Sequence, residues 1–155
     1  MRARTLLIAL GLVLATPGTA LAPPPHVLIC SVSATSVSFG VFRLGDIAQS
    51  TGEITILCFG NEGETVDVAL SSGQSNDYGQ RFMTHGRFRM LYNLYTDFLH
   101  LFVWGDGSRG TRIQRVRLRP SPVDVETLTV YGQIPRQTLT AAGDYLDQIT
   151  VTVTY

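Results

Sequence analysis

Residues 51–59, TGEITILCF, place Ile54, Ile56 and Cys58 on one face of a strand, with Thr55 and Leu57 on the other. Side chains of a β-strand alternate between its two faces, so this period of two predicts a strand with one face in a core. The same period recurs in segments rich in β-branched and aromatic residues. These segments predict further strands at residues 30–42, 64–71, 87–97, 98–104, 123–133 and 145–155.

Clusters of turn-forming residues separate these segments, at residues 60–63, 72–77, 105–108 and 120–122. Beyond residue 22, no stretch of ten residues follows the 3.6-residue period of a helix. Seven or so short strands at this spacing predict an all-β protein. An antiparallel β-sandwich is favoured over a barrel and over alternating strands and helices.

Residues 1–22 have the layout of a secretory signal peptide. Arg2 and Arg4 precede a ten-residue apolar run at 6–15, and small residues follow. The run is shorter than the roughly 20 residues that a transmembrane helix needs. We expect cleavage after Ala20 or Ala22, export of a soluble product, a short Pro-rich extension at 23–29 and one domain at 30–155.

The composition excludes two classes of protein. The chain is 45% hydrophobic and 15% charged, which is too apolar for a disordered protein. Its 12 basic residues, all Arg, balance 12 acidic ones, and removal of Arg2 and Arg4 leaves 10 − 12 = −2. A nucleic-acid-binding domain normally carries a basic excess, so no nucleic acid is expected as a partner.

The predicted mature chain holds two cysteines, Cys30 and Cys58. An even number in an exported protein predicts a disulfide. Closing this loop of 29 residues would stabilise the fold by about 3.6 kcal/mol in the chain-entropy model. A metal pair or a catalytic thiol lacks support, because there is no C-x-x-C motif and His26, His85 and His100 are scattered.

Motifs for catalysis are missing from the sequence. It contains no G-x-S-x-G, Walker, H-E-x-x-H or EF-hand pattern. Asp144 and Asp147 are three positions apart in a predicted strand, so they would lie on opposite faces and could not act as an acid–base pair. The sequence predicts a protein that is not an enzyme, with no cofactor and no metal site.

One segment, residues 109–119, is strongly basic and contains no acid: Arg109, Arg112, Arg115, Arg117 and Arg119. Its last three arginines alternate with Val116 and Leu118, which predicts a strand with one basic face. Outward charges of this kind protect an edge strand from aggregation. The alternative is an anion-binding stripe for acidic polysaccharide, lipid headgroups or a surface.

Seven short motifs, taken together and in order, resemble the spore coat protein U (SCPU) domain family, which includes the archaic Csu-type chaperone–usher pilins. The resemblance covers the whole predicted mature domain and includes both cysteines. The motifs are CSVSAT with VSFG (30–40), STGEITILC (50–58), VDVALSSG (66–73), LYNLYTD (91–97), WGDG (104–107), VYGQIP (130–135) and GDYLDQITVTVTY (143–155).

The resemblance implies an immunoglobulin-like sandwich that lacks its last strand. Such subunits are completed by a strand from a periplasmic chaperone and then by a neighbouring subunit, a form of β-augmentation. It also implies an outer-membrane usher and sister pilin subunits as partners. The final predicted strand would be the edge that contacts chaperone or donor strand, through Ile149, Val151, Val153 and Tyr155.

The segment ahead of Cys30 departs from a pilin donor strand. Pro23, Pro24 and Pro25 cannot donate ladder hydrogen bonds, and only Val27 and Ile29 form a period-two pair. We therefore expect a secreted structural or adhesive pilus subunit at a terminal position, exported through the periplasm to the cell surface. The alternatives are a stand-alone module that binds an anionic glycan or an abiotic surface, and a coat-layer structural protein.

Overall fold

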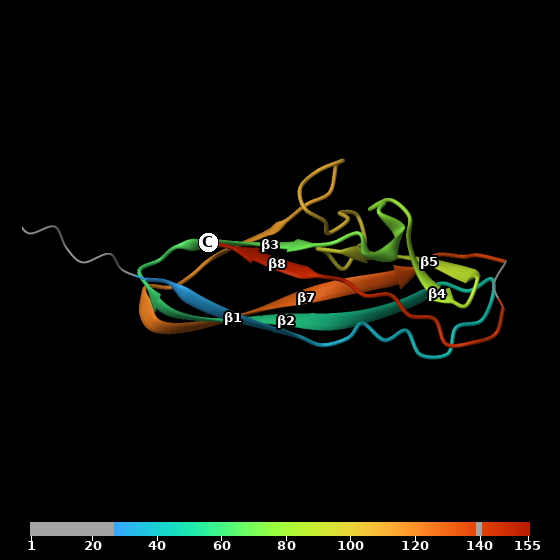
Figure 1. Cartoon of the computed structure of the whole chain (residues 1–155), viewed down its shortest axis with the longest axis horizontal. Helices are drawn as coiled ribbons and strands as arrows, with labels where there is room; N and C mark the ends of the chain where they lie inside the picture. The colour runs from blue at the N-terminus through green and yellow to red at the C-terminus, as the bar shows by residue number, and fades with distance from the viewer. Residues whose placement is uncertain (1–26, 139–140) are drawn as a thin grey trace, which may run out of the picture.

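The computed structural model describes residues 27–138 and 141–155, so the predicted signal peptide lies outside the described residues. The fold is an antiparallel β-sandwich (Figure 1). One sheet has the strand order β1-β2-β7-β5-β4 and the other the order β6-β3-β8. The strands are β1 (Ile29–Ala34), β2 (Ala48–Asn61), β3 (Thr65–Leu70), β4 (Arg81–His85), β5 (Phe88–Tyr95), β6 (Gln114–Arg117), β7 (Ser121–Ile134) and β8 (Val151–Thr154).

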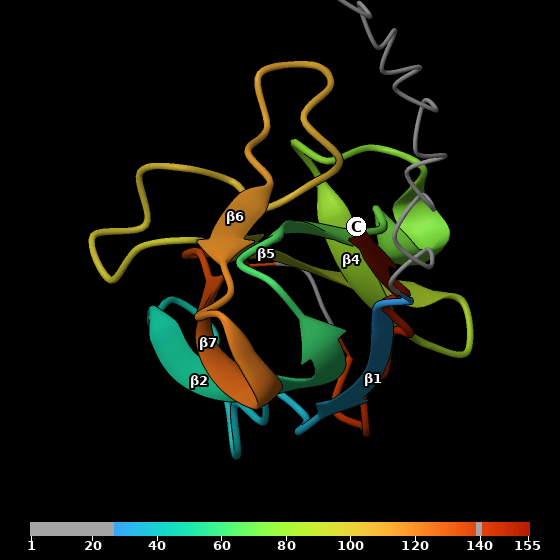
Figure 2. The ribbon, with the colours of Figure 1, turned by 90° about the vertical axis from the view of Figure 1, so that its left-hand side faces the viewer.

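The two longest strands, β2 and β7, form the centre of the larger sheet and pair from Ala48–Ile134 to Asn61–Ser121. Figure 2, turned by 90°, shows the smaller sheet above this twisted ribbon. The alternation seen in residues 51–59 is the one that builds the core, because Ile54, Ile56 and Cys58 are buried against the second sheet. Trp104 is fully buried in the same core, and its Nε1 donates a hydrogen bond to the Val68 carbonyl oxygen at 2.9 Å.

Cys30 and Cys58 lie directly opposite each other in β1 and β2 and form a disulfide. Cys58 faces the core, so the bond fastens the edge strand β1 to the centre of the sheet from the inside. Within the described residues, no helix is both long and apolar enough to cross a membrane. A single 3₁₀ turn, η1 (Gly73–Ser75), follows β3.

Three predicted strands differ from those observed, and one observed strand was not predicted. The strand expected at 30–42 ends at Ala34, and the one expected at 145–155 is confined to Val151–Thr154. Strand β4, which pairs with β5 from Arg81–Tyr92 to His85–Phe88, was not predicted. Residues 98–104 form a loop with isolated bridges at Val103 and Trp104, because hydrogen bonds from the N–H groups of Leu101 and Phe102 to the Asp97 carboxylate close the chain on itself.

Candidate functional site: an open groove between the first and last segments

The sandwich is open along one side. Strand β1 pairs only with β2 and strand β8 only with β3, so each leaves one edge without a strand partner among the described residues. The chain that follows β1, residues 35–44, and the chain that leads into β8, residues 141–150, run along this side (Figure 1). Leu146 pairs with Thr84 of β4 through two backbone hydrogen bonds, which anchors the later segment at one end.

Two adjoining cavities of about 360 Å³ and 860 Å³ lie between these segments. They share lining residues, including Val37, Phe39 and Tyr145, and so form one continuous groove. Its floor consists of core side chains that are nearly buried, whereas its walls are half-exposed or exposed. The floor residues are Ile54, Leu70, Met90, Tyr92, Leu94, Val130 and Ile134.

Two glycines make room for the first wall of the groove. Gly52 of β2 and Gly132 of β7 face inward in their strands, next to Val37 and Phe39. A Cβ atom at Gly132 would lie 2.6 Å from Val37 Cγ1 and 2.8 Å from Phe39 Cζ. Neither glycine has a positive φ, so space and not backbone conformation requires them. The segment after β1 therefore folds onto the inner face of the sheet and partly fills the sandwich.

Asp147 fastens the second wall. Its Oδ1 accepts hydrogen bonds from the backbone N–H and the side-chain amide of Gln74, each at 3.1 Å, and its Oδ2 accepts one from the Tyr92 hydroxyl at 2.7 Å. Burial and the Asp147 hydrogen bond both raise the pKa of Tyr92, so its hydroxyl stays protonated and donates. These bonds tie the segment before β8 to η1 and to the groove floor.

The four residues predicted for the partner-binding edge divide in two. Ile149 and Val151 line the groove and pack against the core. Val153 also packs against the core but lies further along β8, opposite Val68. Tyr155 is 57% exposed and borders a separate shallow depression with Asp67 and Arg115. Of the four residues, only Ile149 and Val151 thus line the groove.

A buried arginine organises the interior beside the groove. Arg81 is fully buried and donates hydrogen bonds to the carbonyl oxygens of Ser71 and Trp104 and to Oδ1 of Asn93. Desolvation lowers the pKa of Arg81, but these acceptors satisfy its guanidinium inside the sandwich. Sequence reasoning missed Arg81 because it belongs to β4, the strand that was not predicted.

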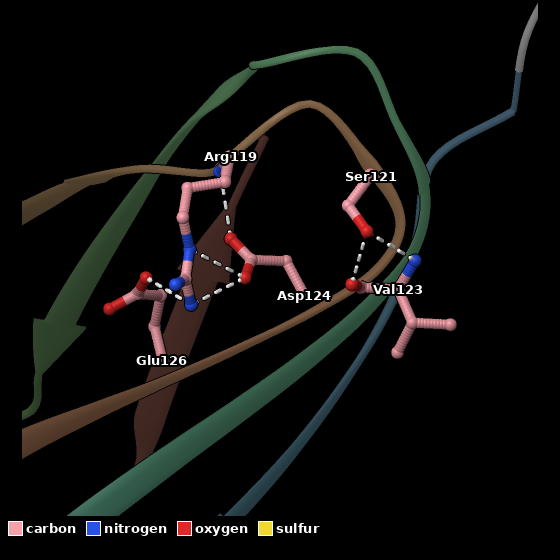
Figure 3. Close-up of polar contacts among 5 residues, drawn as sticks. All are labelled: Arg119, Ser121, Val123, Asp124 and Glu126. Carbon is pink, nitrogen blue, oxygen red and sulfur yellow. Dashed lines mark hydrogen bonds and ion pairs between the residues drawn. The ribbon is translucent and has the colours of Figure 1, made fainter.

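The five arginines predicted as a stripe are not equivalent. Arg115 forms a two-bond ion pair with Asp67, at 2.6 and 2.7 Å. Arg119 binds the buried Asp124 through its backbone N–H and its guanidinium, and it approaches Glu126 (Figure 3). The Arg119 N–H and guanidinium lower the pKa of Asp124. Among the described residues, Arg109, Arg112 and Arg117 have no carboxylate partner within ion-pair distance.

Arg109 and Arg112 lie in the loop that precedes β6, so only Arg115 and Arg117 are on the strand itself. Residues 27–138 and 141–155 contain no cluster of three or more His, Cys, Asp or Glu side chains that could hold a metal ion. The carboxylate of Asp147 binds Gln74 and Tyr92, and the contact of Asp144 is made by its backbone oxygen, 3.2 Å from His85 Nδ1. These contacts do not join the Asp144 and Asp147 carboxylates as an acid–base pair.

Comparison with solved structures finds a similar fold in pilus subunits. A chain of the CsuC–CsuE chaperone–tip adhesion subunit pre-assembly complex, from the archaic chaperone–usher Csu pili of Acinetobacter baumannii, superposes with a TM-score of 0.58 at 19% identity. The match covers 83% of this chain and 40% of that one, so this chain spans less than half the length of its structural relative.

A second match, to a chaperone–tip adhesin complex of CFA/I fimbriae, has a TM-score of 0.47 at 10% identity, covering 81% of this chain and 42% of that one. No curated protein matches the sequence significantly. The model of the Spore Coat Protein U domain matches residues 21–152, which is most of the sequence and includes both groove walls. The chain therefore belongs to the Spore Coat Protein U domain family.

Proposed function

We propose that this protein is a structural subunit of a chaperone–usher surface fibre and that its groove accepts a β-strand from another protein. The observation that carries the proposal is the groove itself, an apolar channel between the segment that follows β1 and the segment that precedes β8, two strands that each keep one unpaired edge among the described residues. An exposed edge over an apolar floor favours aggregation unless another strand covers it. An added strand supplies backbone hydrogen bonds to the edge and alternate side chains to the floor.

The partners follow from this proposal. A periplasmic chaperone would cover the groove before assembly, and a sister subunit would replace it at the outer-membrane usher. The lining of the groove includes Asp144 and Asp147 but no arginine, and its floor is apolar. We therefore expect the inserted strand to present alternating apolar side chains, without an acidic residue on that face.

We also propose that the subunit occupies a terminal position in the fibre. Ile29 already pairs with Phe59 as the first residue of β1, so it serves the subunit's own sheet. Of the period-two pair Val27 and Ile29, only Val27 precedes the strand, and the prolines at 23–25 lack N–H donors. The residues ahead of β1 thus make a poor donor, whereas the groove makes a good acceptor.

Co-expression with a periplasmic chaperone of the same fibre system, followed by co-purification, tests the proposal. The wild-type chain should co-purify with the chaperone. The I149E/V151E double variant should lose this association, because it places two charges on the groove wall. The T152E variant is the matched control, since Thr152 lies on the exposed face of β8. Equal recovery of all three proteins with the chaperone would refute the proposed binding site.

Anion binding by the basic segment stays a prediction. Arg109, Arg112 and Arg117 are its best candidates, because Arg115 and Arg119 already pair with carboxylates. An anionic glycan would bind these three residues, and the chain would then act as an adhesive module at the fibre surface.

A further inference from the structure

The outer face of the larger sheet is apolar at one end. Strands β1, β2 and β7 pair there so that Ile29 lies opposite Phe59, and Phe59 lies opposite Val123. Two residues along the same face of β2, Leu57 lies opposite Val125. Side chains directly opposite each other in neighbouring strands share a face, with Cβ atoms about 4.5–5.5 Å apart. These residues therefore form one contiguous group, here called the outer patch.

The outer patch is open to solvent among the described residues. Four of its members are between 45% and 60% exposed: Ile29, Phe59, Val123 and Val125. Further along the same face, the paired positions of the three strands are polar: Ser33, Glu53, Thr55, Thr127 and Thr129. Polar residues are the ordinary covering of a sheet face that meets water, whereas a contiguous apolar group marks an interaction site. The outer patch thus indicates a surface that is covered in the working protein.

The chain enters the described fold beside the outer patch. Ile29, a member of the patch, is the first residue of β1. Val27 lies against the end of β2, because a Cβ atom at Gly60 would be 2.8 Å from the Val27 carbonyl oxygen. Figure 1 shows the start of β1, the turn after β2 and the turn before β7 together at the left end of the molecule. The residues ahead of Val27 therefore begin next to the patch.

The segment ahead of Val27 has the length and composition to cover the outer patch. Residues 23–26, PPPH, lie outside the described residues and follow either expected cleavage site of the signal peptide. Consecutive prolines favour the polyproline II helix, which rises about 3.1 Å per residue, so four residues span about 12 Å. Crossing from β1 over β2 to β7 takes about 10 Å, because neighbouring strands are about 4.8 Å apart. The segment can therefore reach every residue of the patch.

We propose that residues 23–26 fold back across the outer patch of their own subunit, with the proline rings packed on Phe59, Val123 and Val125. Proline has no N–H to add to a sheet ladder, but its ring is apolar and its fixed φ lowers the entropy lost on docking. Neither the segment nor the patch contains Asp, Glu or Arg, so the contact buries no charged side chain.

A second copy of the chain fits the outer patch less well, because each copy would bring its own residues 23–26 into the contact. No residue of the patch lines either cavity of the groove. The proposal therefore does not depend on strand acceptance by the groove.

Nuclear Overhauser effects in the mature chain, beginning at Leu21, test the contact directly. We expect them between the ring protons of Pro24 and the ring of Phe59 or the methyl groups of Val125. A sample that mixes isotope-labelled and unlabelled chains separates contacts within one chain from contacts between two. Absence of these effects would overturn the proposal. Effects only between chains would also overturn it, since a second copy would then cover the patch.

Melting temperatures give a second test. The length-matched variant P23S/P24S/P25S should melt roughly 3–5 °C below the wild type, the shift expected for a small surface contact in a domain of this size. Lost proline rigidity alone also lowers stability, so a second substitution decides. F59S should lower the melting temperature more in the wild type than in the triple-serine variant, where the ring has no proline to contact. F98S is the matched control, because Phe98 is also exposed but lies outside the patch, and its effect should be the same in both. An equal effect of F59S in both would contradict the proposal.

Discussion

Replacement of Gly132 by alanine probes how the first wall of the groove is built. The added Cβ would approach Val37 Cγ1 to 2.6 Å and Phe39 Cζ to 2.8 Å, closer than carbon atoms can pack. Overpacking of this kind costs about 1–3 kcal/mol, while the loss of glycine entropy in the unfolded chain returns about 0.4–1 kcal/mol. We therefore expect G132A to lower the free energy of unfolding by about 1–2 kcal/mol.

Urea denaturation followed by the fluorescence of Trp104, the single tryptophan, measures this change. V37A should restore part of the stability when combined with G132A, because it removes the nearer clashing atom; a double-mutant cycle would isolate this coupling. G79A is the matched control, since the nearest atom to a Cβ at Gly79 is 3.4 Å away. Unchanged stability of G132A, or no coupling to V37A, would refute the inward packing of residues 35–41.

Three further predictions concern the supporting contacts. R81M should destabilise the fold by about 3–5 kcal/mol in urea denaturation, because the carbonyl groups of buried Trp104 and half-buried Ser71 lose their donor. R89M, at an exposed position, should change the unfolding free energy by less than about 1 kcal/mol. The pKa of Asp124 is lowered in the fold, so its stabilisation is present above the unfolded value of about 3.9 and is lost as pH falls below it; D124N should flatten the decline in unfolding free energy between about pH 5 and 3, and a decline as steep as in the wild type would contradict this. On heparin resin, R109Q/R112Q/R117Q should elute at lower salt than R115Q/R119Q, because Arg115 and Arg119 already pair with carboxylates in the wild type. Identical elution would refute the prediction that Arg109, Arg112 and Arg117 are the anion-binding residues.

The strand pattern was predictable because burial and alternation coincide in it. In β2, Ile54, Ile56 and Cys58 are inward and buried, as the period of two requires. The same rule failed beyond Ala34, where Val37 and Phe39 keep the alternation but leave the sheet ladder. Gly52 and Gly132, against which Val37 and Phe39 pack, are the residues in the sequence that indicate this departure from the sheet. A glycine at an inward position of a strand indicates that another part of the chain approaches closely.

The wall contacts of the groove could not be predicted from local pattern. The bonds of Asp147 reach Gln74 and Tyr92, which are 73 and 55 residues away in the chain. Arg81 looks like a surface residue by type, and only the fold supplies its three acceptors. The apolar run at 98–104 resembles a buried strand by composition. Its exposure follows from the hydrogen bonds of Asp97, which alternation does not reveal.

The groove between residues 34–44 and 141–151 is proposed to accept a strand from another protein. The most direct measurement is the melting temperature of the purified chain, titrated with a donor peptide from a sister subunit. At a concentration 100 times its dissociation constant, a specific peptide stabilises the folded state by about 2.7 kcal/mol, which corresponds to roughly 10 °C for a domain of this size. We expect this rise for the wild type and not for I149E/V151E. No rise with any sister donor peptide, or an equal rise in the double variant, would show that the groove does not accept a strand.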